Sequence, residues 1–147
     1  MSKAKTGALI VIEQQQLLSD FEQTGIKVDA EVTNQLLTTI FENKTPLHDG
    51  AVLIRNNRIV AATCILPLTE KNVDKKLGTR HRAAIGTSEV SDAFILVVSE
   101  ESGSISMAHS GNLKRNLSES NIKEMLIKPL ESIDGKKPSR RKRRQKQ

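Results

Sequence analysis

The sequence places His48 and Asp49 side by side, directly before Gly50 and Ala51 at the entrance to an aliphatic run. An imidazole next to a carboxylate can bind a metal ion or accept a proton, and a glycine lets the backbone approach a ligand closely. The competing interpretation is a surface turn without function, because Asp-Gly pairs are common in turns. The chemical interpretation of these residues therefore depends on what accompanies them.

A second cluster, at positions 78–82, has the sequence Gly-Thr-Arg-His-Arg. If Thr79 caps a helix here, the next backbone N–H groups lie without partners at the positive end of the helix dipole. Arg80, His81 and Arg82 would add positive charge and make an anion site suited to phosphate, although successive helix positions are about 100° apart and cannot all face one ligand. The alternative is a solvated basic helix start, but positive residues oppose the dipole there, and such a local conflict is typical of function.

A third cluster, Ser99, Glu100 and Glu101, precedes Ser102 and Gly103 in a predicted turn between two strands. Adjacent carboxylates can bind a divalent cation or hold an arginine in place, and hydroxyls can donate to phosphate oxygens. A solvated acidic turn is the simpler alternative. An anion site, a metal-capable His/Asp pair and a further acid pair in one chain are the parts of metal-assisted phosphoryl or nucleotidyl transfer.

Other nucleotide and metal motifs are absent from the sequence. It contains no Walker A motif, dinucleotide-binding glycine fingerprint, nucleophile elbow or paired-cysteine zinc pattern. Cys64 is the only cysteine, so no disulfide forms within the chain, and its aliphatic surroundings predict a small buried hydrophobic residue. His109 shows no ligand-like spacing to other residues.

The charge of the chain is concentrated at one end. The 147 residues include 23 Lys and Arg against 17 Asp and Glu, and eight of these basic residues fall in positions 136–147, which contain no acidic residue. The other 15 face all 17 acidic residues over positions 1–135, a net charge of −2. We therefore expect a domain over 1–135, without the electrostatic footprint of duplex DNA binding and with no specific nucleic acid partner.

Positions 136–147 are too polar and too highly charged to fold alone and predict a basic disordered tail. Three roles stay open for it: contact with an anionic membrane, non-specific binding of nucleic acid, or no role beyond that of a solvated end. The longest apolar run near the start, at 7–12, has six residues, against the roughly 20 that span a bilayer. We expect the chain to be a cytoplasmic domain.

The hydrophobic pattern that must position these clusters alternates between strands and helices. Strands are expected at 7–13, in a hairpin over 50–68 that turns at Asn56-Asn57, and at 93–99 and 104–109. Helices are expected over 14–25, 29–45, 79–90 and 118–134. The order predicts an α/β fold, with a mixed β-sheet core flanked by helices.

Four segments together resemble the catalytic domain of diadenylate cyclases. They are GALIVIE at 7–13, TPLHDGAVLI at 45–54, GTRHRAAIGTSEVSDA at 78–93 and VVSEESGSIS at 97–106. The DGA and RHR motifs of that family stand in the right order, and the likeness covers roughly residues 7–130. The pattern is most similar to the membrane-associated type, in which N-terminal transmembrane helices precede the catalytic domain.

The resemblance implies a reaction in which two ATP molecules give cyclic di-AMP, a second messenger, and two pyrophosphates across a face-to-face homodimer. It implies Mn²⁺ or Mg²⁺ as the metal, and a membrane regulatory protein and a phosphoglucosamine mutase as partners. Implied catalytic residues are Asp49, Gly50, Ala51, Arg80, His81 and Arg82. Implied nucleotide-binding residues are Leu66, Gly78, Thr79, Arg80, His81, Arg82, Ser99, Glu100 and Glu101. Implied metal ligands are His48, Asp49 and Glu101.

Ile65 departs from the family, whose members often place Tyr beside the adenine at this point. Stacking on a base is worth roughly 1–3 kcal/mol, so adenine binding is expected to be weaker here, while backbone hydrogen bonding near Leu66 survives. Ser102 stands where Thr is usual and keeps the hydroxyl. A domain that senses a nucleotide without turning it over is the alternative function, although simple binding does not require the His48-Asp49 pair.

Overall fold

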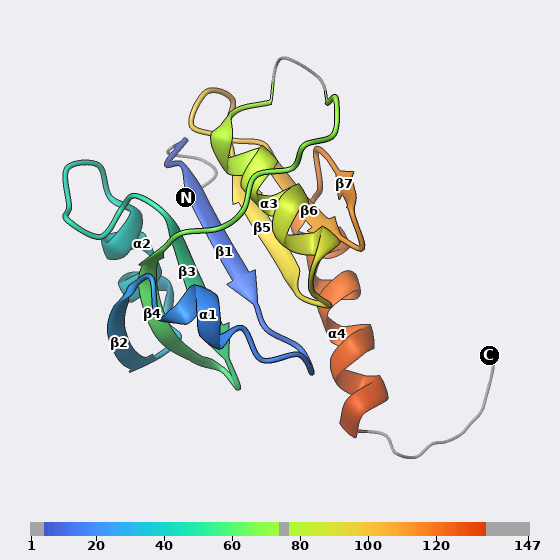
Figure 1. Cartoon of the computed structure of the whole chain (residues 1–147), viewed down its shortest axis with the longest axis horizontal. Helices are drawn as coiled ribbons and strands as arrows, with labels where there is room; N and C mark the ends of the chain where they lie inside the picture. The colour runs from blue at the N-terminus through green and yellow to red at the C-terminus, as the bar shows by residue number, and fades with distance from the viewer. Residues whose placement is uncertain (1–4, 74–76, 135–147) are drawn as a thin grey trace. The chain divides into compact units, whose positions relative to one another are not determined.

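The computed structural model describes residues 5–73 and 77–134, with side chains described as far as Leu126. Seven strands form one mixed sheet in the order β2-β4-β3-β1-β5-β6-β7, in which β1 and β3 are parallel and every other neighbouring pair is antiparallel (Figure 1). The strands are β1 (Ala8–Ile12), β2 (Ile26–Glu31), β3 (Ala51–Arg55), β4 (Arg58–Cys64), β5 (Phe94–Val98), β6 (Ile105–His109) and β7 (Asn112–Lys114). The predicted α/β fold with a mixed sheet is confirmed.

Alternate side chains of the central strand β1 enter two separate cores, because successive residues of a strand point to opposite faces. Leu9 and Val11 pack in a cluster that includes Ala83 and Ala84 of α3 (Thr79–Glu89). Ala8 and Ile10 pack in a second cluster with Ile40 and Phe41 of α2 (Asn34–Phe41). Helices therefore cover both faces of the sheet and bury its centre.

The predicted hairpin is present and turns where expected. Asn56 and Asn57 have φ values of 50° and 63°, the left-handed conformation that a two-residue hairpin turn requires and that asparagine tolerates. β3 and β4 pair on either side of it, with register shifts that make the returning strand β4 irregular. This irregularity matters below, because the end of β4 borders a cavity.

The expected helix from Asp29 is wrong at its start. Asp29 lies inside β2 with φ 51°, at a register shift against β4, and α2 begins only after Thr33. The Thr33 hydroxyl accepts the backbone N–H of Leu36 at 3.0 Å and so forms the N-cap. Pairing with β4, a contact distant in sequence, outweighs the local pattern that favoured a longer helix.

The helix expected over 14–25 is also shorter, since α1 covers only Ser19–Glu22. Three backbone N–H groups of the stretch before α1 have side-chain acceptors. The Asp92 carboxylate accepts those of Gln15 and Gln16 at 3.1–3.3 Å, and the buried Glu13 carboxylate accepts that of Leu18 at 2.9 Å. These bonds hold this stretch as a connection between β1 and α1.

A second compact unit begins at Leu117 and contains α4 (Glu119–Asp134), close to the predicted bounds. Ser118 precedes it, and its hydroxyl accepts the backbone N–H of Asn121 at 3.1 Å, the bond of an N-cap. In the part of the chain that the structure describes, no helix is long and apolar enough to cross a membrane. The predicted tail at 136–147 lies outside the described residues, and the division at residue 135 stays a prediction.

Candidate active site

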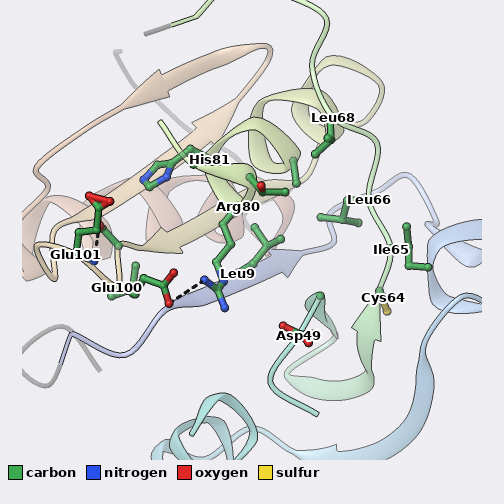
Figure 2. A pocket seen from close by; sticks show the side chains of 16 residues that line it. Leu9, Asp49, Cys64, Ile65, Leu66, Leu68, Arg80, His81, Glu100 and Glu101 are labelled. Carbon is green, nitrogen blue, oxygen red and sulfur yellow. Dashed lines mark hydrogen bonds and ion pairs between the residues drawn. The ribbon is translucent and has the colours of Figure 1, made fainter. Parts of the chain in front are cut away.

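A cavity of about 440 Å³ lies where β1 and β3 begin and β4 and β5 end (Figure 2). The strand register explains this convergence, because Ala8 pairs with Val98 and Ala51 with Cys64. The cavity brings together residues of all three predicted clusters. The predicted site residues that line it are Asp49, Gly50, Leu66, Gly78, Thr79, Arg80, His81, Ser99, Glu100 and Glu101, of which only Leu66 lies outside the three clusters.

Arg80, Glu100 and Glu101 gather with His81 on one side of the cavity, at the N-terminus of α3, whereas Asp49 lies nearer Cys64 (Figure 2). The prediction that Thr79 caps this helix is wrong: Gly78 is the N-cap, and Thr79 is the first helical residue. No side chain caps this terminus, and the space beside Gly78 is open, with nothing within 4 Å of a Cβ added there. The backbone N–H groups of the first turn can therefore meet an anion from the cavity.

Arg80 is held at this end by two neighbours. Its side chain is 24% exposed, and Nη1 lies 3.7 Å from Oε2 of Glu100, which the loop after β5 presents (Figure 2). Behind it lies the backbone of Gly7, where an added Cβ would come within 2.7 Å of Nη1 and 2.9 Å of Cζ. The guanidinium thus occupies space that any other residue at position 7 would fill.

His81 also lines the cavity, whereas Arg82 does not. Burial, together with the positive charges of Arg115 and Arg80, lowers the pKa of His81 below the ordinary value of 6.5, so the imidazole is neutral at pH 7. The Arg82 carbonyl accepts the backbone N–H of Thr69 at 3.0 Å. One helical turn cannot aim three consecutive side chains at a single ligand, and Arg82 is the one outside the cavity wall.

The loop after β5 presents the hydroxyl of Ser99 as a hydrogen-bond donor. Ser99 Oγ accepts the backbone N–H groups of Glu101 at 3.2 Å and Ser102 at 3.3 Å. A hydroxyl that accepts two such bonds still has its own hydrogen to donate, and Ser99 lines the cavity. Gly103, with φ 78°, closes the loop by donating to the Ser99 carbonyl at 2.9 Å.

Asp49 reaches the cavity from the turn before β3, with a side chain that is 87% exposed. The turn needs glycine at position 50: φ is +81°, and an added Cβ would lie 2.8–2.9 Å from backbone atoms of Thr63 and Cys64. Ala51, predicted beside Gly50 as a site residue, is buried in the core and is not among the cavity-lining residues. The tight fit of Gly50 against β4 brings Asp49 to the end of that strand.

The orientation of His48 suits a cation ligand. Its Nδ1 donates to the carbonyl of Thr45 at 2.8 Å, and Nε2 lies 3.4 Å from Oδ1 of Asp49. A neutral imidazole that donates through Nδ1 has a lone pair on Nε2, so two electron-rich atoms face each other unless a proton or a metal ion lies near them. The pair therefore fits a divalent cation.

Protein groups alone do not complete a metal site here. Among residues 5–73 and 77–134, no group of three or more His, Cys, Asp or Glu side chains is arranged to hold a metal ion. Glu101 lines the same cavity, but His48 is not among its lining residues. Magnesium sites often use one or two carboxylates and take their other oxygens from substrate phosphates and water, so a metal at His48 and Asp49 would need such oxygens.

The other side of the cavity is aliphatic (Figure 2). Ile65 and Leu68 are 69% and 51% exposed, unusual values for such side chains, and Leu66 is buried between them. Cys64 lies at the base, where burial, with a smaller contribution from Glu22, raises the pKa of its thiol to about 11, so it stays protonated. The prediction that Cys64 is a small buried hydrophobic residue is confirmed.

The aliphatic wall follows a strained residue at the end of β4. Thr63 has φ +57°, which is unfavourable for a β-branched residue, at a register shift between β3 and β4. The segment that follows packs against α3 at Gly86, where an added Cβ would clash with the carbonyl oxygen of Pro67. The bulge bends the chain out of the sheet, and Gly86 lets it lie on the helix.

Sequence reasoning missed part of the cavity wall. Leu9, Leu68, Ala83 and Val98 line it but have no chemical signature, because aliphatic residues in strands and helices predict core. Gly7 and Gly86 were missed for a different reason. A glycine inside an apolar strand or helix signals a close approach, but it does not say which part of the chain approaches.

Known proteins match the chain over most of its length. A family model described as DisA bacterial checkpoint controller nucleotide-binding matches residues 1–113. Cyclic di-AMP synthase CdaA of Bacillus subtilis (strain 168) is 51% identical over 127 residues, which are 86% of this chain and 46% of the relative. A diadenylate cyclase of Listeria monocytogenes serotype 1/2a (strain 10403S) is 46% identical over 140 residues, which are 95% of this chain and 51% of the relative. The chain spans about half the length of these curated relatives.

A solved structure extends the likeness to three dimensions. The crystal structure of a DacA double mutant from Staphylococcus aureus is similar with a TM-score of 0.85 at 46% identity, covering 87% of this chain and 86% of that one. The family model matches residues 1–113, more than half of the chain, and this range includes every residue that lines the cavity. The chain belongs to the DAC family, the DisA bacterial checkpoint controller nucleotide-binding domains.

Proposed function

We propose that this chain is a diadenylate cyclase, which condenses two ATP molecules into cyclic di-AMP and two pyrophosphates. The observation that carries the proposal is the division of one cavity into a phosphate-suited side and an aliphatic side, with Asp49 on its wall. The names of the curated relatives support the same activity. Family membership supports ATP as the nucleotide.

In this proposal the triphosphate lies at the N-terminus of α3. Backbone N–H groups after Gly78, the Arg80 guanidinium and the Ser99 hydroxyl converge there as donors. Such preorganised donors stabilise negative charge as it develops on the departing pyrophosphate. The adenine lies against Ile65, Leu66 and the other aliphatic residues, whose apolar surface suits the faces of a base.

Asp49 is the proposed proton acceptor. The 3′-hydroxyl oxygen of one ATP attacks the α-phosphorus of the other, its proton passes to the Asp49 carboxylate, and the bond from the α-phosphorus to the pyrophosphate oxygen breaks. The same exchange on the second ATP closes the ring, so two phosphodiester bonds form and two pyrophosphates leave. Exposure of Asp49 lets it reach a substrate that a second protein copy holds.

His48 and Asp49 are the proposed metal ligands, together with phosphate oxygens of the nucleotide and with Glu101 near the phosphates. Mn²⁺ or Mg²⁺ would supply charge neutralisation at the phosphates. A cavity of about 440 Å³ suits one small-molecule ligand, so two ATP molecules call for two copies facing each other. By resemblance to the membrane-associated type, a longer parent protein would be anchored in the cell membrane and would meet its regulatory protein and the phosphoglucosamine mutase there.

The test compares the purified chain with its Asp49→Asn variant, given ATP with Mn²⁺ or Mg²⁺, and measures cyclic di-AMP by mass spectrometry. We expect turnover to fall by about 10²- to 10⁴-fold, the usual contribution of a positioned proton acceptor. The thermal unfolding midpoint should stay the same because Asp49 is exposed.

Asp29→Asn is the matched control, since Asp29 is an exposed aspartate on β2, lies outside the cavity wall and has a left-handed backbone that asparagine tolerates. It should leave turnover unchanged. Wild-type turnover by Asp49→Asn would refute the assigned role. ATP-dependent thermal stabilisation without product, across metals and at high protein concentration, would instead support a nucleotide sensor.

A further inference from the structure

The aliphatic wall of the cavity includes Ile65 and Leu66, which follow the last paired residue of β4. The last pairs that β4 makes are Ala62 with Ile26 on one side and Cys64 with Ala51 on the other. Ile65 therefore follows the end of the ladder, and its backbone N–H has no strand partner. An exposed backbone donor can bond to water or to a side chain, and only a side-chain acceptor ties the wall to another segment of the protein.

Thr24 provides that acceptor. Its hydroxyl oxygen accepts the N–H of Ile65 at 2.8 Å and donates its own hydrogen to the carbonyl of Phe21 at 2.6 Å. Both functions of the hydroxyl are used, so its orientation is fixed from two sides. The side chain links the end of α1 to the wall, and Thr24 is not among the residues that line the cavity.

The next residue brings the two segments into contact. A Cβ added at Gly25 would clash with the carbonyl oxygen of Ala62 and would lie 2.7 Å from Sγ of Cys64. Glycine at this position therefore lets the chain after α1 lie directly on β4. The contact sets the distance across which Thr24 reaches Ile65.

A partly buried ion-pair network holds α1 itself in place. Arg55 Nη2 lies 2.7 Å from Oε1 of Glu22 in α1, and its Nε lies 2.6 Å from Oε1 of Glu13. The Glu13 side chain is only 1% exposed, which makes this a firm anchor at the end of β1. The ion pairs thus fix α1 relative to the sheet, and the hydrogen bond from Ile65 to Thr24 fixes the cavity wall relative to α1.

We propose that Thr24 is a positioning residue for base recognition: its hydroxyl holds the Ile65-Leu66 backbone in the conformation that receives the adenine. This role rests on the proposed function, because it assumes that the aliphatic side of the cavity binds the base. Loss of the hydroxyl would release the Ile65 N–H and let the wall shift. Ligands that use the base should lose affinity, while ligands that use only the phosphate side should not.

The experiment measures dissociation constants for ATP and for inorganic tripolyphosphate, which has the phosphates but no base, by titration calorimetry. Thr24→Val removes the hydroxyl at nearly constant shape, and Thr24→Ser keeps it. We expect Thr24→Val to weaken ATP binding by about 3- to 10-fold, the usual effect of one lost hydrogen bond, and tripolyphosphate binding by less than about 2-fold. Thr24→Ser should restore ATP affinity to within about 2-fold of wild type.

Thr39→Val is the matched control, because the exposed Thr39 on α2 donates to the Gln35 carbonyl at 2.7 Å and lies outside the cavity wall. It should change neither constant. Unchanged ATP affinity in Thr24→Val, equal loss of both ligands, or failure of Thr24→Ser to restore binding would overturn the positioning role alone. A wild-type chain that binds neither ligand would overturn the proposed function with it.

Discussion

At the scale of single residues, the placement of Arg80 depends on Gly7, which has no side chain. Gly7, the buried residue directly before β1, leaves room for the guanidinium, and Glu100 lies 3.7 Å from it. Glu100 is 69% exposed, so this ion pair by itself contributes little to stability. The ion pair instead orients the Arg80 side chain along the cavity wall.

Gly7→Ala should therefore reduce turnover without unfolding the protein. The new methyl group would lie 2.7 Å from Arg80 Nη1, and the flexible end of the arginine side chain can move away, which misplaces the charge. We expect a fall of about 10- to 100-fold in turnover, as small misplacements in active sites produce. The measurement is the rate of cyclic di-AMP formation beside thermal unfolding.

A double-mutant cycle with Arg80→Ala tests whether the effect of Gly7→Ala passes through Arg80. In the Arg80→Ala background, Gly7→Ala should cost no further activity. Independent, multiplying losses would show that Gly7 acts through something other than Arg80.

His81 makes stability depend on pH. Its pKa is lowered in the folded protein, mainly by burial and further by Arg115 and Arg80, so the unfolded chain binds a proton at higher pH than the folded one. Stability is then fully present above 6.5, the ordinary value, and is lost as the pH falls toward the lower pKa of the folded state. Unfolding midpoints of wild type should fall over this interval more steeply than those of His81→Gln, and equal slopes would contradict this.

At the scale of secondary-structure elements, the Arg55 network fastens β1, β3 and α1 together. Arg55 comes from the end of β3, Glu13 follows β1, and Glu22 ends α1. Hydrogen bonds to both glutamates raise the pKa of Arg55, so the guanidinium keeps its charge. Because the Glu13 side chain is 1% exposed, its carboxylate depends on this partner.

Arg55→Met should lower the free energy of unfolding by about 3–5 kcal/mol, since it leaves the Glu13 carboxylate buried without its counter-ion. Arg58→Met is the matched control, because Arg58 forms a comparable pair with Asp29 at 3.1 Å, with both side chains more than half exposed. Exposed pairs contribute about 0–1 kcal/mol. Urea unfolding measures both variants, and similar losses would refute the structural importance assigned to Glu13.

At the scale of the whole molecule, the proposed reaction needs two cavities. The cavity described above has the size for a single nucleotide, with Asp49 exposed on its wall. Cyclic di-AMP per chain should therefore rise with protein concentration while most chains are monomers, because the active species contains two of them. Assays over a dilution series, beside light scattering, measure this dependence. Constant activity per chain in samples shown to be monomeric would contradict the face-to-face arrangement.

Charge at this scale is divided along the chain. The eight basic residues at 136–147 account for the positive net charge, whereas positions 1–135 carry −2. The basic groups that face the cavity, Arg80 above all, are few and are held by specific neighbours. Net charge therefore says little about the site.

Patterns in the sequence predict the class of the fold and most of the residues that line the cavity. Aliphatic runs of strand length, the Asn56-Asn57 turn and the three polar clusters are local patterns, and local patterns depend on spacing alone. The prediction failed where a distant segment decided the outcome. β2 forms because β4 offers it a partner, and the helix expected from Asp29 therefore begins only after Thr33.

Long-range contacts in the fold, which the sequence does not reveal, identify the residues without a chemical signature that support the cavity. Gly7 faces Arg80, Gly86 receives the turn after Pro67, and Thr24 holds the N–H of Ile65 across 41 positions of sequence. The residue types alone do not indicate which distant residue each of them contacts. A hydrogen bond or a steric limit belongs to two atoms at once, and the sequence gives the identity of each but not the distance between them.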